Sequence, residues 1–112
     1  MEAMVIFITT SSPEEAERIG RKIVEERLAA CVNIISPIRS IFHWKGEICE
    51  EGEALLIAKS VKSKLEKIIT RVKELHSYEV PEIIALPIVG GSEDYLKWVQ
   101  EETQINEGGY LV

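Results

Sequence analysis

The segment of residues 76–82 brings together side chains that can do chemistry. It holds an imidazole at His76, a phenol at Tyr78 and carboxylates at Glu79 and Glu82. The segment lies between residues with helical periodicity and an apolar run of strand length, and functional side chains often gather at such junctions. Imidazole and carboxylate groups are ligands for divalent transition metals. The sequence therefore predicts a ligand site at this junction.

His76 and Glu79 are the predicted metal-binding pair, for Cu(II) or another divalent cation that is not obligatory for folding. Two ligands make a weak site, because tight transition-metal sites normally use three or four protein ligands. A competent site would need Glu82 or donors from a neighbouring subunit as well. The alternative is that His76 caps the end of a helix, where the helix dipole favours a protonated imidazole.

Other side chains are candidates for a cleft or interface between subunits. These cleft candidates are Trp44, Lys59, Tyr78 and Glu82. Tyr78 combines a polar hydroxyl with an apolar ring, and with Glu79 and Lys59 it either lines a subunit boundary or forms only a packed ring and a salt bridge. Trp44 lies at an expected hairpin tip, where aromatic side chains commonly pack against a neighbour.

The elements that must position these residues begin with an apolar strand over residues 4–8. Ser12, Pro13 and Glu15 then predict a helix that starts with a capping box. Residues 30–44 and 48–59 predict two long strands of one hairpin, joined at Lys45 and Gly46. Pro37 predicts a bulge or an edge within the first of them.

The second half of the chain repeats the pattern of helix and strand. Apolar residues recur at helical spacing over residues 61–75, and residues 83–89 predict a fourth strand. Ser92 begins a last, short helix. The order is strand, helix, strand, strand, helix, strand, which predicts one α+β domain over residues 1–112, with a ferredoxin-like antiparallel sheet and an extra C-terminal helix.

Two features of this fold predict self-association, because a single chain has no use for them. Val5 and Phe7 point to one face of the first strand and Ile6 and Ile8 to the other, so both faces are apolar. Two helices cover only one face. The hairpin is also longer than a small sheet needs. We expect another copy of the chain to cover the second face.

Composition excludes several classes of partner and setting. The net charge of −6 disfavours nucleic acid, and no apolar run approaches the length of a membrane span. Residues 4–8 lack a basic leader, so they predict a strand and not a signal peptide. Cys31 and Cys49 lack Cys-x-x-Cys spacing, which is typical of reduced thiols in a cytoplasmic protein.

Five motifs in order resemble the CutA divalent-cation tolerance family. They cover residues 29–34, 44–46, 56–59, 76–83 and 95–98. The resemblance implies a ferredoxin-like subunit, a homotrimer, a cytosolic setting and an association with copper and other divalent ions. The chain departs from the family at Ser77, where proline is usual, and at Thr9 and Thr10, where some relatives have a cysteine.

The predicted function is that of a trimeric, cytosolic protein for divalent-cation (copper) binding and tolerance. The alternative is a trimeric scaffold or signalling module that binds a small molecule or a protein partner at subunit clefts. We do not expect an enzyme, because no nucleophile or acid/base pair has a recognisable spacing. The loop of residues 9–15 lacks the arginine of acylphosphatases and the cysteines of metallochaperones, which share the fold.

Overall fold

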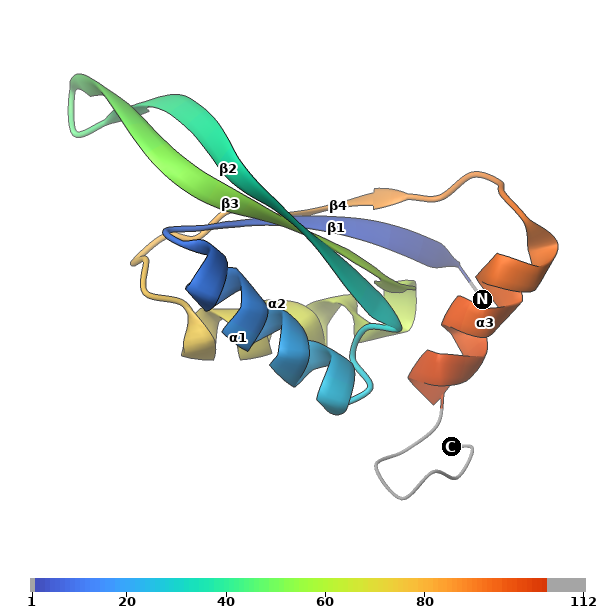
Figure 1. Cartoon of the computed structure of the whole chain (residues 1–112). Coiled ribbons are helices and arrows are strands. Elements are labelled where there is room, and N and C mark those ends of the chain that lie inside the picture. The colour runs from blue at the N-terminus through green and yellow to red at the C-terminus, as the bar shows by residue number, and fades with distance from the viewer. Residues whose placement is uncertain (1, 105–112) are drawn as a thin grey trace.

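A four-stranded antiparallel sheet in the order β2-β3-β1-β4 is the scaffold of the computed structural model, which describes residues 2–104 (Figure 1). Residues 1 and 105–112, the two ends of the predicted domain, lie outside the described residues. The strands are β1 (Ala3–Thr10), β2 (Cys31–Trp44), β3 (Glu47–Val61) and β4 (Ile83–Pro87). β1 lies in the middle of the sheet, between β3 and β4, because its register matches both of them.

Two helices cover one face of this sheet, and a third lies at its end (Figure 1). The helices are α1 (Pro13–Glu25), α2 (Leu65–Leu75) and α3 (Glu93–Gln104), and a short 3₁₀ turn, η1 (Lys62–Lys64), precedes α2. This order of elements confirms the predicted ferredoxin-like α+β fold with an extra C-terminal helix.

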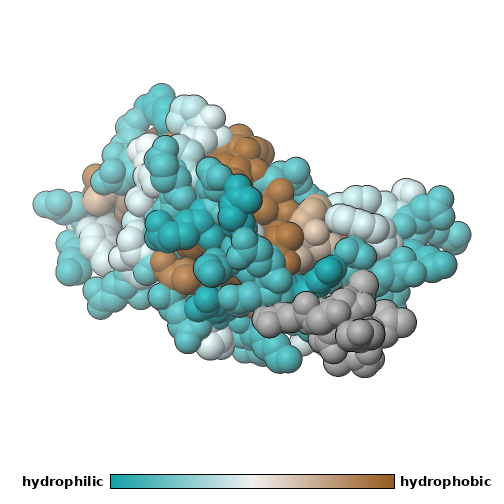
Figure 2. Space-filling view, turned by 60° about the horizontal axis from the view of Figure 1, so that its bottom comes forward, coloured by the Kyte–Doolittle hydropathy of each residue, from teal (hydrophilic) through white to brown (hydrophobic). Residues whose placement is uncertain are grey.

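The core lies between the sheet and the pair α1 and α2. Its largest fully buried side chains are Ile6, Ile8, Ile19, Ile23, Leu56, Ile68 and Val72. Helix α1 approaches the sheet closely at Gly20, where an added Cβ would lie 2.9 Å from Cγ2 of Val32. The helix-covered side is largely hydrophilic on its outer surface, with smaller hydrophobic patches between the polar groups (Figure 2).

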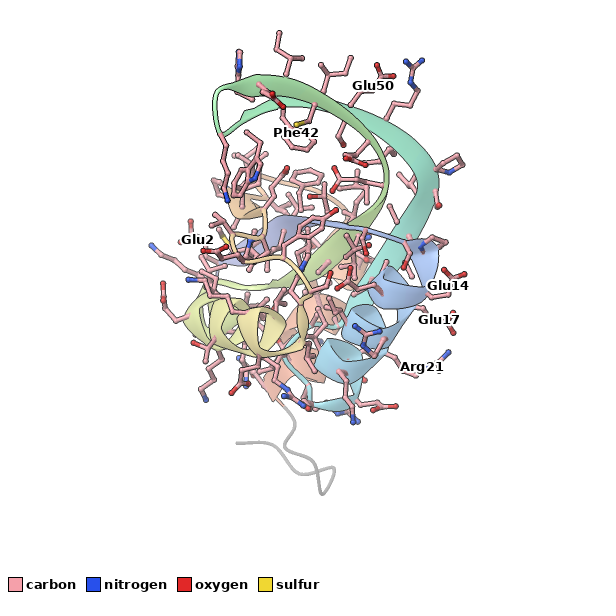
Figure 3. All side chains as sticks on the ribbon, turned by 90° about the vertical axis from the view of Figure 1, so that its left-hand side faces the viewer. Glu2, Glu14, Glu17, Arg21, Phe42 and Glu50 are labelled. Carbon is pink, nitrogen blue, oxygen red and sulfur yellow. The ribbon has the colours of Figure 1, made fainter. Side chains whose placement is uncertain are left out.

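The long hairpin of β2 and β3 turns at Lys45 and Gly46, as predicted. Both residues have positive φ, 50° and 83°, which is typical of the two-residue turns that suit the twist of a hairpin. A register shift between Ile35 and Ile38 confirms the bulge predicted at Pro37. The hairpin arches away from the body, with Phe42 on its inner side and Glu50 on its outer side (Figure 3).

Two predicted boundaries were wrong by several residues. Val61 continues strand β3, because it pairs with Ala3 and is buried, so the second helix begins only at Leu65. The fourth strand ends at Pro87 and not at residue 89. Beyond Pro87 the N–H of Ile88 still bonds to the carbonyl of Ala3 at 2.9 Å, and Ala3 is the first residue of β1, so the partner strand ends there.

No helix of the described chain packs over the middle of the second face of the sheet, and Tyr95 of α3 reaches it only at the end that holds Cys31. We call this second face the open face, and its apolar residues are Val5, Phe7, Ile35, Leu55, Ile57, Ile84 and Leu86. Ile84 and Leu86, on the edge strand β4, are 54% and 53% exposed. Large contiguous apolar surfaces of this kind mark interaction sites.

Candidate functional site

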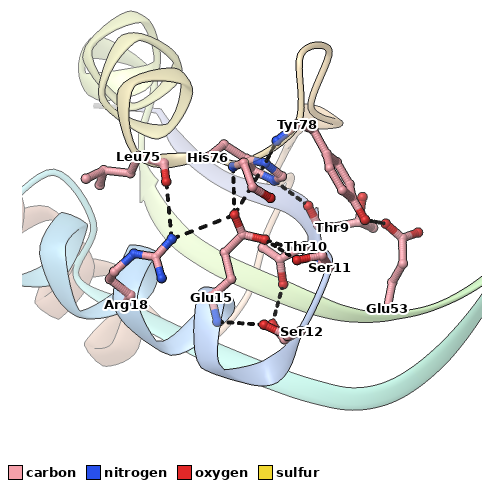
Figure 4. A network of polar contacts seen from close by, with 11 residues as sticks. Thr9, Thr10, Ser11, Ser12, Glu15, Arg18, Glu53, Leu75, His76 and Tyr78 are labelled. Carbon is pink, nitrogen blue, oxygen red and sulfur yellow. Dashed lines mark hydrogen bonds and ion pairs between the residues drawn. The ribbon is translucent and has the colours of Figure 1, made fainter.

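The predicted junction folds against the ends of β1 and α1 (Figure 4). Helix α2 ends at Leu75, and the N–H of His76 still bonds to the carbonyl of Val72 at 2.9 Å. His76 is therefore the C-terminal cap residue of α2 through its backbone, whereas its ring contacts Thr9 and Tyr78, so the part of the alternative that rests on a protonated imidazole is not tested. The loop that follows reaches β4 at Ile83.

The imidazole of His76 is fully buried, and both of its ring nitrogens have protein partners. Nε2 lies 2.7 Å from the carbonyl oxygen of Thr9, and Nδ1 accepts the backbone N–H of Tyr78 at 3.0 Å. A nitrogen that accepts a hydrogen bond carries no proton, so in this arrangement the ring is neutral with its proton on Nε2. His76 ties the end of β1 to the loop between α2 and β4.

Glu15 is a buried carboxylate beside this imidazole. Its Oε1 accepts from the backbone N–H and hydroxyl of Ser11 at 3.0 and 2.8 Å, and its Oε2 accepts from the N–H of Ser77 at 2.7 Å. Burial by itself raises the pKa of Glu15, but these hydrogen bonds outweigh it and hold the pKa at about 2. Glu15 therefore stays ionised, with Nδ1 of His76 at 3.8 Å and the guanidinium of Arg18 also at 3.8 Å.

The predicted capping box is confirmed in one half and corrected in the other. Ser12 caps α1, and its side chain accepts the N–H of Glu15 at 3.1 Å. In a capping box the glutamate would bond back to the N–H of the cap residue. The carboxylate of Glu15 instead bonds to Ser11 and Ser77, because the loop after α2 lies within its reach.

Tyr78 links the same loop to the hairpin. Its hydroxyl donates to Oε2 of Glu53 at 2.7 Å, and its ring lies 4.8 Å from that of His76, centroid to centroid. Burial raises the pKa of the Tyr78 phenol, and the hydrogen bond to the Glu53 carboxylate raises it further. Glu53 is only 8% exposed, so Tyr78 satisfies a carboxylate that has little contact with water.

The described chain does not by itself form a metal site of ordinary strength. Glu79 and Glu82 are exposed, whereas His76 is engaged on both nitrogens. Among residues 2–104, no group of three or more His, Cys, Asp or Glu side chains lies close enough to hold a metal ion. A single copy does not fit a tight divalent-cation site, and binding through His76 would require one of its hydrogen bonds to break.

The other cleft candidates lie apart from the junction within one copy. Lys59 pairs with Val5 and Cys31, six residues along β3 from Glu53, so it lies about 20 Å from the partner of Tyr78. The structure therefore does not bring Lys59 and Tyr78 together in one chain. Trp44 is 44% exposed near the hairpin tip, with the ammonium of Lys45 5.7 Å from its ring centre.

Sequence reasoning missed the partners that hold this junction together. The sequence pattern did point to Glu15, because this residue stands three positions after a helix cap. Nothing in the local pattern connects Glu15 with Ser77. No sequence pattern singles out Glu53, because it follows several other glutamates in a strand with an exposed end. Only the packing of β1, α1 and α2 brings these groups within hydrogen-bonding distance.

The fold and these features define a class of protein: a ferredoxin-like subunit with a protruding hairpin, an open apolar sheet face and a polar junction at one end. The profile of the CutA1 divalent ion tolerance protein family matches residues 4–102. The chain belongs to this family, and its resemblance to CutA proteins is confirmed.

Sequence relatives come from bacteria and eukaryotes. The Divalent-cation tolerance protein CutA of Thermus thermophilus is 50% identical over 99 residues, which are 88% of this chain and 96% of that protein. The human Protein CutA is 44% identical over 98 residues, which are 88% of this chain. This chain spans only 55% of the human protein.

Solved structures of CutA proteins share the fold. The structure from T. thermophilus superposes with a TM-score of 0.88 at 48% identity and covers 89% of this chain and 97% of its own. CutA1 from Oryza sativa gives a TM-score of 0.89 at 40% identity, covering 91% and 94%. Within residues 2–104 no helix has the length and apolar character needed to cross a membrane.

Proposed function

We propose that this protein is a trimeric divalent-cation tolerance protein of the cytoplasm, which associates with Cu(II) or another divalent cation. The observation that carries the proposal is the match of residues 4–102 to the CutA1 divalent ion tolerance family. The name describes tolerance of ions and not a reaction, so the proposed activity is binding without catalysis. The net charge of −6 disfavours nucleic acid as a partner.

The open face supports the assembly. On β3 this face continues onto the inner side of the hairpin as Glu47, Cys49, Glu51 and Glu53, which share it with Leu55 and Ile57, so its apolar part on the hairpin comes from β2. Phe42 and Trp44 of β2 point to that same side, since they pair with Cys49 and Glu47. The resulting concave surface suits the body of a second copy, and the family resemblance implies three subunits.

The cation is proposed to bind where subunits meet. One copy provides the exposed carboxylates of Glu79 and Glu82, three and six residues after His76 in the sequence, and this set is too small for tight binding. Donors from a neighbouring subunit would complete it. The prediction that His76 and Glu79 are ligands stays a prediction, since His76 must first release Thr9 or Tyr78.

Calorimetric titration of the reduced protein with Cu(II) tests this proposal, at a concentration where light scattering shows a trimer. The variants are His76→Ala and Glu79→Gln, with Glu66→Gln on the exposed side of α2 as the matched control. Saturable binding with a Kd of about 1 µM or tighter, weakened at least tenfold by either test variant but not by the control, is the expected result. Weak uptake that is equal in all four proteins would refute the ion site.

The second candidate is a trimeric scaffold or signalling module without a cation site. The observation that favours it is the complete engagement of the buried His76 ring, which makes this residue a structural link between β1 and the loop after α2. On this reading His76→Ala lowers stability and leaves the uptake of Cu(II) unchanged. A thermal unfolding curve, recorded with and without Cu(II), separates the two candidates.

The cytoplasmic setting is supported by the two free thiols of Cys31 and Cys49, which suit a reducing compartment. Fractionation of the source cells, followed by detection with an antibody, tests it. Recovery in a membrane or secreted fraction would refute this part of the proposal.

A further inference from the structure

Four polar side chains interrupt the open face at the end nearest α3. Cys31 and Lys59 are direct partners across β2 and β3, and Asn33 lies two residues along on the same side. The ammonium of Lys59 donates to Oδ1 of Asn33. Tyr95 reaches in from α3, with its hydroxyl 3.1 Å from Sγ of Cys31. We call Cys31, Asn33, Lys59 and Tyr95 the polar cluster.

The charge of the polar cluster is not balanced within the described chain. Among residues 2–104, no carboxylate forms an ion pair with Lys59, and its hydrogen-bond partner is the neutral amide of Asn33. Its neighbours in register, Val5 and Cys31, are not anionic partners either. Burial and the contact with Cys31 raise the pKa of Tyr95 to about 12, so its hydroxyl keeps its proton.

The proposed trimer makes this imbalance unfavourable. When a second copy covers the open face, Lys59 loses much of its contact with water. An ion that is removed from water without a partner destabilises the fold. The assembled protein therefore needs an anion at Lys59, and this step of the inference rests on the assembly proposed above.

The surroundings of Lys59 favour a small organic anion. The ammonium has two N–H donors left after its bond to Asn33, and the Asn33 amide is a further donor. The Tyr95 hydroxyl contacts Sγ of Cys31 and becomes a donor to a ligand when it exchanges that contact. Tyr95 and Trp98 stand side by side on α3, with ring centres 5.7 Å apart, and each ring is about 40% exposed. Convergent donors beside an aromatic wall are typical of small-molecule sites.

We propose that Lys59, Asn33 and Tyr95 bind the carboxylate of a small organic acid, whose apolar part lies against Tyr95 and Trp98. A carboxylate suits them because its two oxygens accept from an ammonium and an adjacent amide or hydroxyl in charge-assisted hydrogen bonds.

Benzoate is the probe, because it has a carboxylate and one ring. We expect saturable heat in a calorimetric titration of the full chain with benzoate, none with benzyl alcohol, and weaker binding of acetate. Lys59→Met should weaken benzoate binding at least about tenfold and Tyr95→Phe about threefold. The control Lys73→Met, the same change on the exposed side of α2, should leave binding unchanged. Thermal unfolding curves confirm that each variant is folded.

Light scattering on the same samples separates this proposal from the proposed assembly. A trimer that binds neither benzoate nor acetate overturns the anion site and leaves a carboxylate of the neighbouring copy as the partner of Lys59. Equal benzoate binding by Lys59→Met and the wild type also overturns it, as does binding of inorganic phosphate but not of benzoate. A monomer that binds benzoate through Lys59 refutes the assembly and supports the site.

Discussion

The backbone N–H of Ser77 donates to Oε2 of Glu15 at 2.7 Å and joins two segments that are 62 residues apart in the sequence. Glu15 lies in the first turn of α1, and Ser77 follows the end of α2. The same carboxylate holds Ser11 through its other oxygen (Figure 4). One buried charge thus fixes the geometry of the junction that carries His76, Tyr78 and Glu79.

Replacement of Glu15 by glutamine should lower the free energy of unfolding by about 2–3 kcal/mol. The amide keeps the size of the side chain, but it loses the charge-assisted hydrogen bonds and turns one acceptor into a donor. Urea unfolding near pH 7 measures the change. Glu17→Gln, on the exposed side of the same helix, is the control and should change stability by less than about 0.5 kcal/mol. Equal effects of the two substitutions would contradict the role of Glu15.

The free energy of unfolding should also decrease as the pH is lowered, because the carboxylate of Glu15 becomes protonated. The pKa of Glu15 is lowered from 4.5 to about 2 in the folded protein, so its ionised form stabilises the fold above pH 4.5. This contribution is lost as the pH falls from 4.5 toward about 2. Unfolding curves at a series of pH values should therefore show the wild type and Glu15→Gln converging in acid. A difference that stays constant down to about pH 2 would contradict the assignment.

Tyr78→Phe should destabilise the protein by about 1–3 kcal/mol, because it leaves the carboxylate of Glu53 buried without its donor. The double variant Tyr78→Phe with Glu53→Gln should recover part of this loss. A double-mutant cycle measured by urea unfolding gives the coupling between the two side chains. Additive effects would show that the hydrogen bond contributes nothing. The Tyr78 phenol should also stay protonated above about pH 10 in a spectrophotometric titration, since its pKa is raised.

Gly20→Ala should destabilise the fold by about 1–3 kcal/mol through overpacking. The new Cβ would lie 2.9 Å from Cγ2 of Val32 and 3.2 Å from Cδ1 of Leu56, and both partners belong to the sheet under α1. The matched control is Gly52→Ala, where a Cβ meets nothing within 4 Å. Thermal unfolding of both variants tests the close approach. A Gly20→Ala protein as stable as Gly52→Ala would show that α1 does not press on the sheet here.

Ile84→Lys should dissociate the proposed assembly while the single chain stays folded. The side chain is 54% exposed within one copy, so the fold tolerates a lysine there, but a covered apolar interface does not. Light scattering gives the mass and circular dichroism the fold. Thr70→Lys, exposed on α2, serves as the control and should keep the mass of the wild type. An unchanged mass of Ile84→Lys across a range of concentrations would place the interface elsewhere.

Local patterns predicted the elements well where each pattern had one physical cause. The turn at Lys45 and Gly46 needs two residues that accept positive φ, and the bulge at Pro37 needs a break in the ladder. The errors came where two causes compete. Val61 continues the apolar spacing of α2, but its pairing with Ala3 keeps it in β3.

The sequence predicted where the candidate site lies, but it did not predict the hydrogen-bond partners of its side chains. His76 and Tyr78 were recognised from their types and their place between a helix and a strand. Their partners are the carbonyl of Thr9 and the carboxylate of Glu53, which lie 67 and 25 residues away. A backbone carbonyl has no signature in a sequence, because every residue has one.

By itself the sequence determined the order of elements, the apolar character of both faces of β1 and the membership of the CutA1 family, since these depend on residue types at short spacing. Only the tertiary structure decided that the ring of His76 is buried and neutral, that Glu15 bonds to Ser77, and that Lys59 lies far from Tyr78 on an open face. The physical reason is that hydrogen bonding and desolvation depend on which distant segments meet. That is set by the packing of the whole chain and not by the neighbours of any one residue.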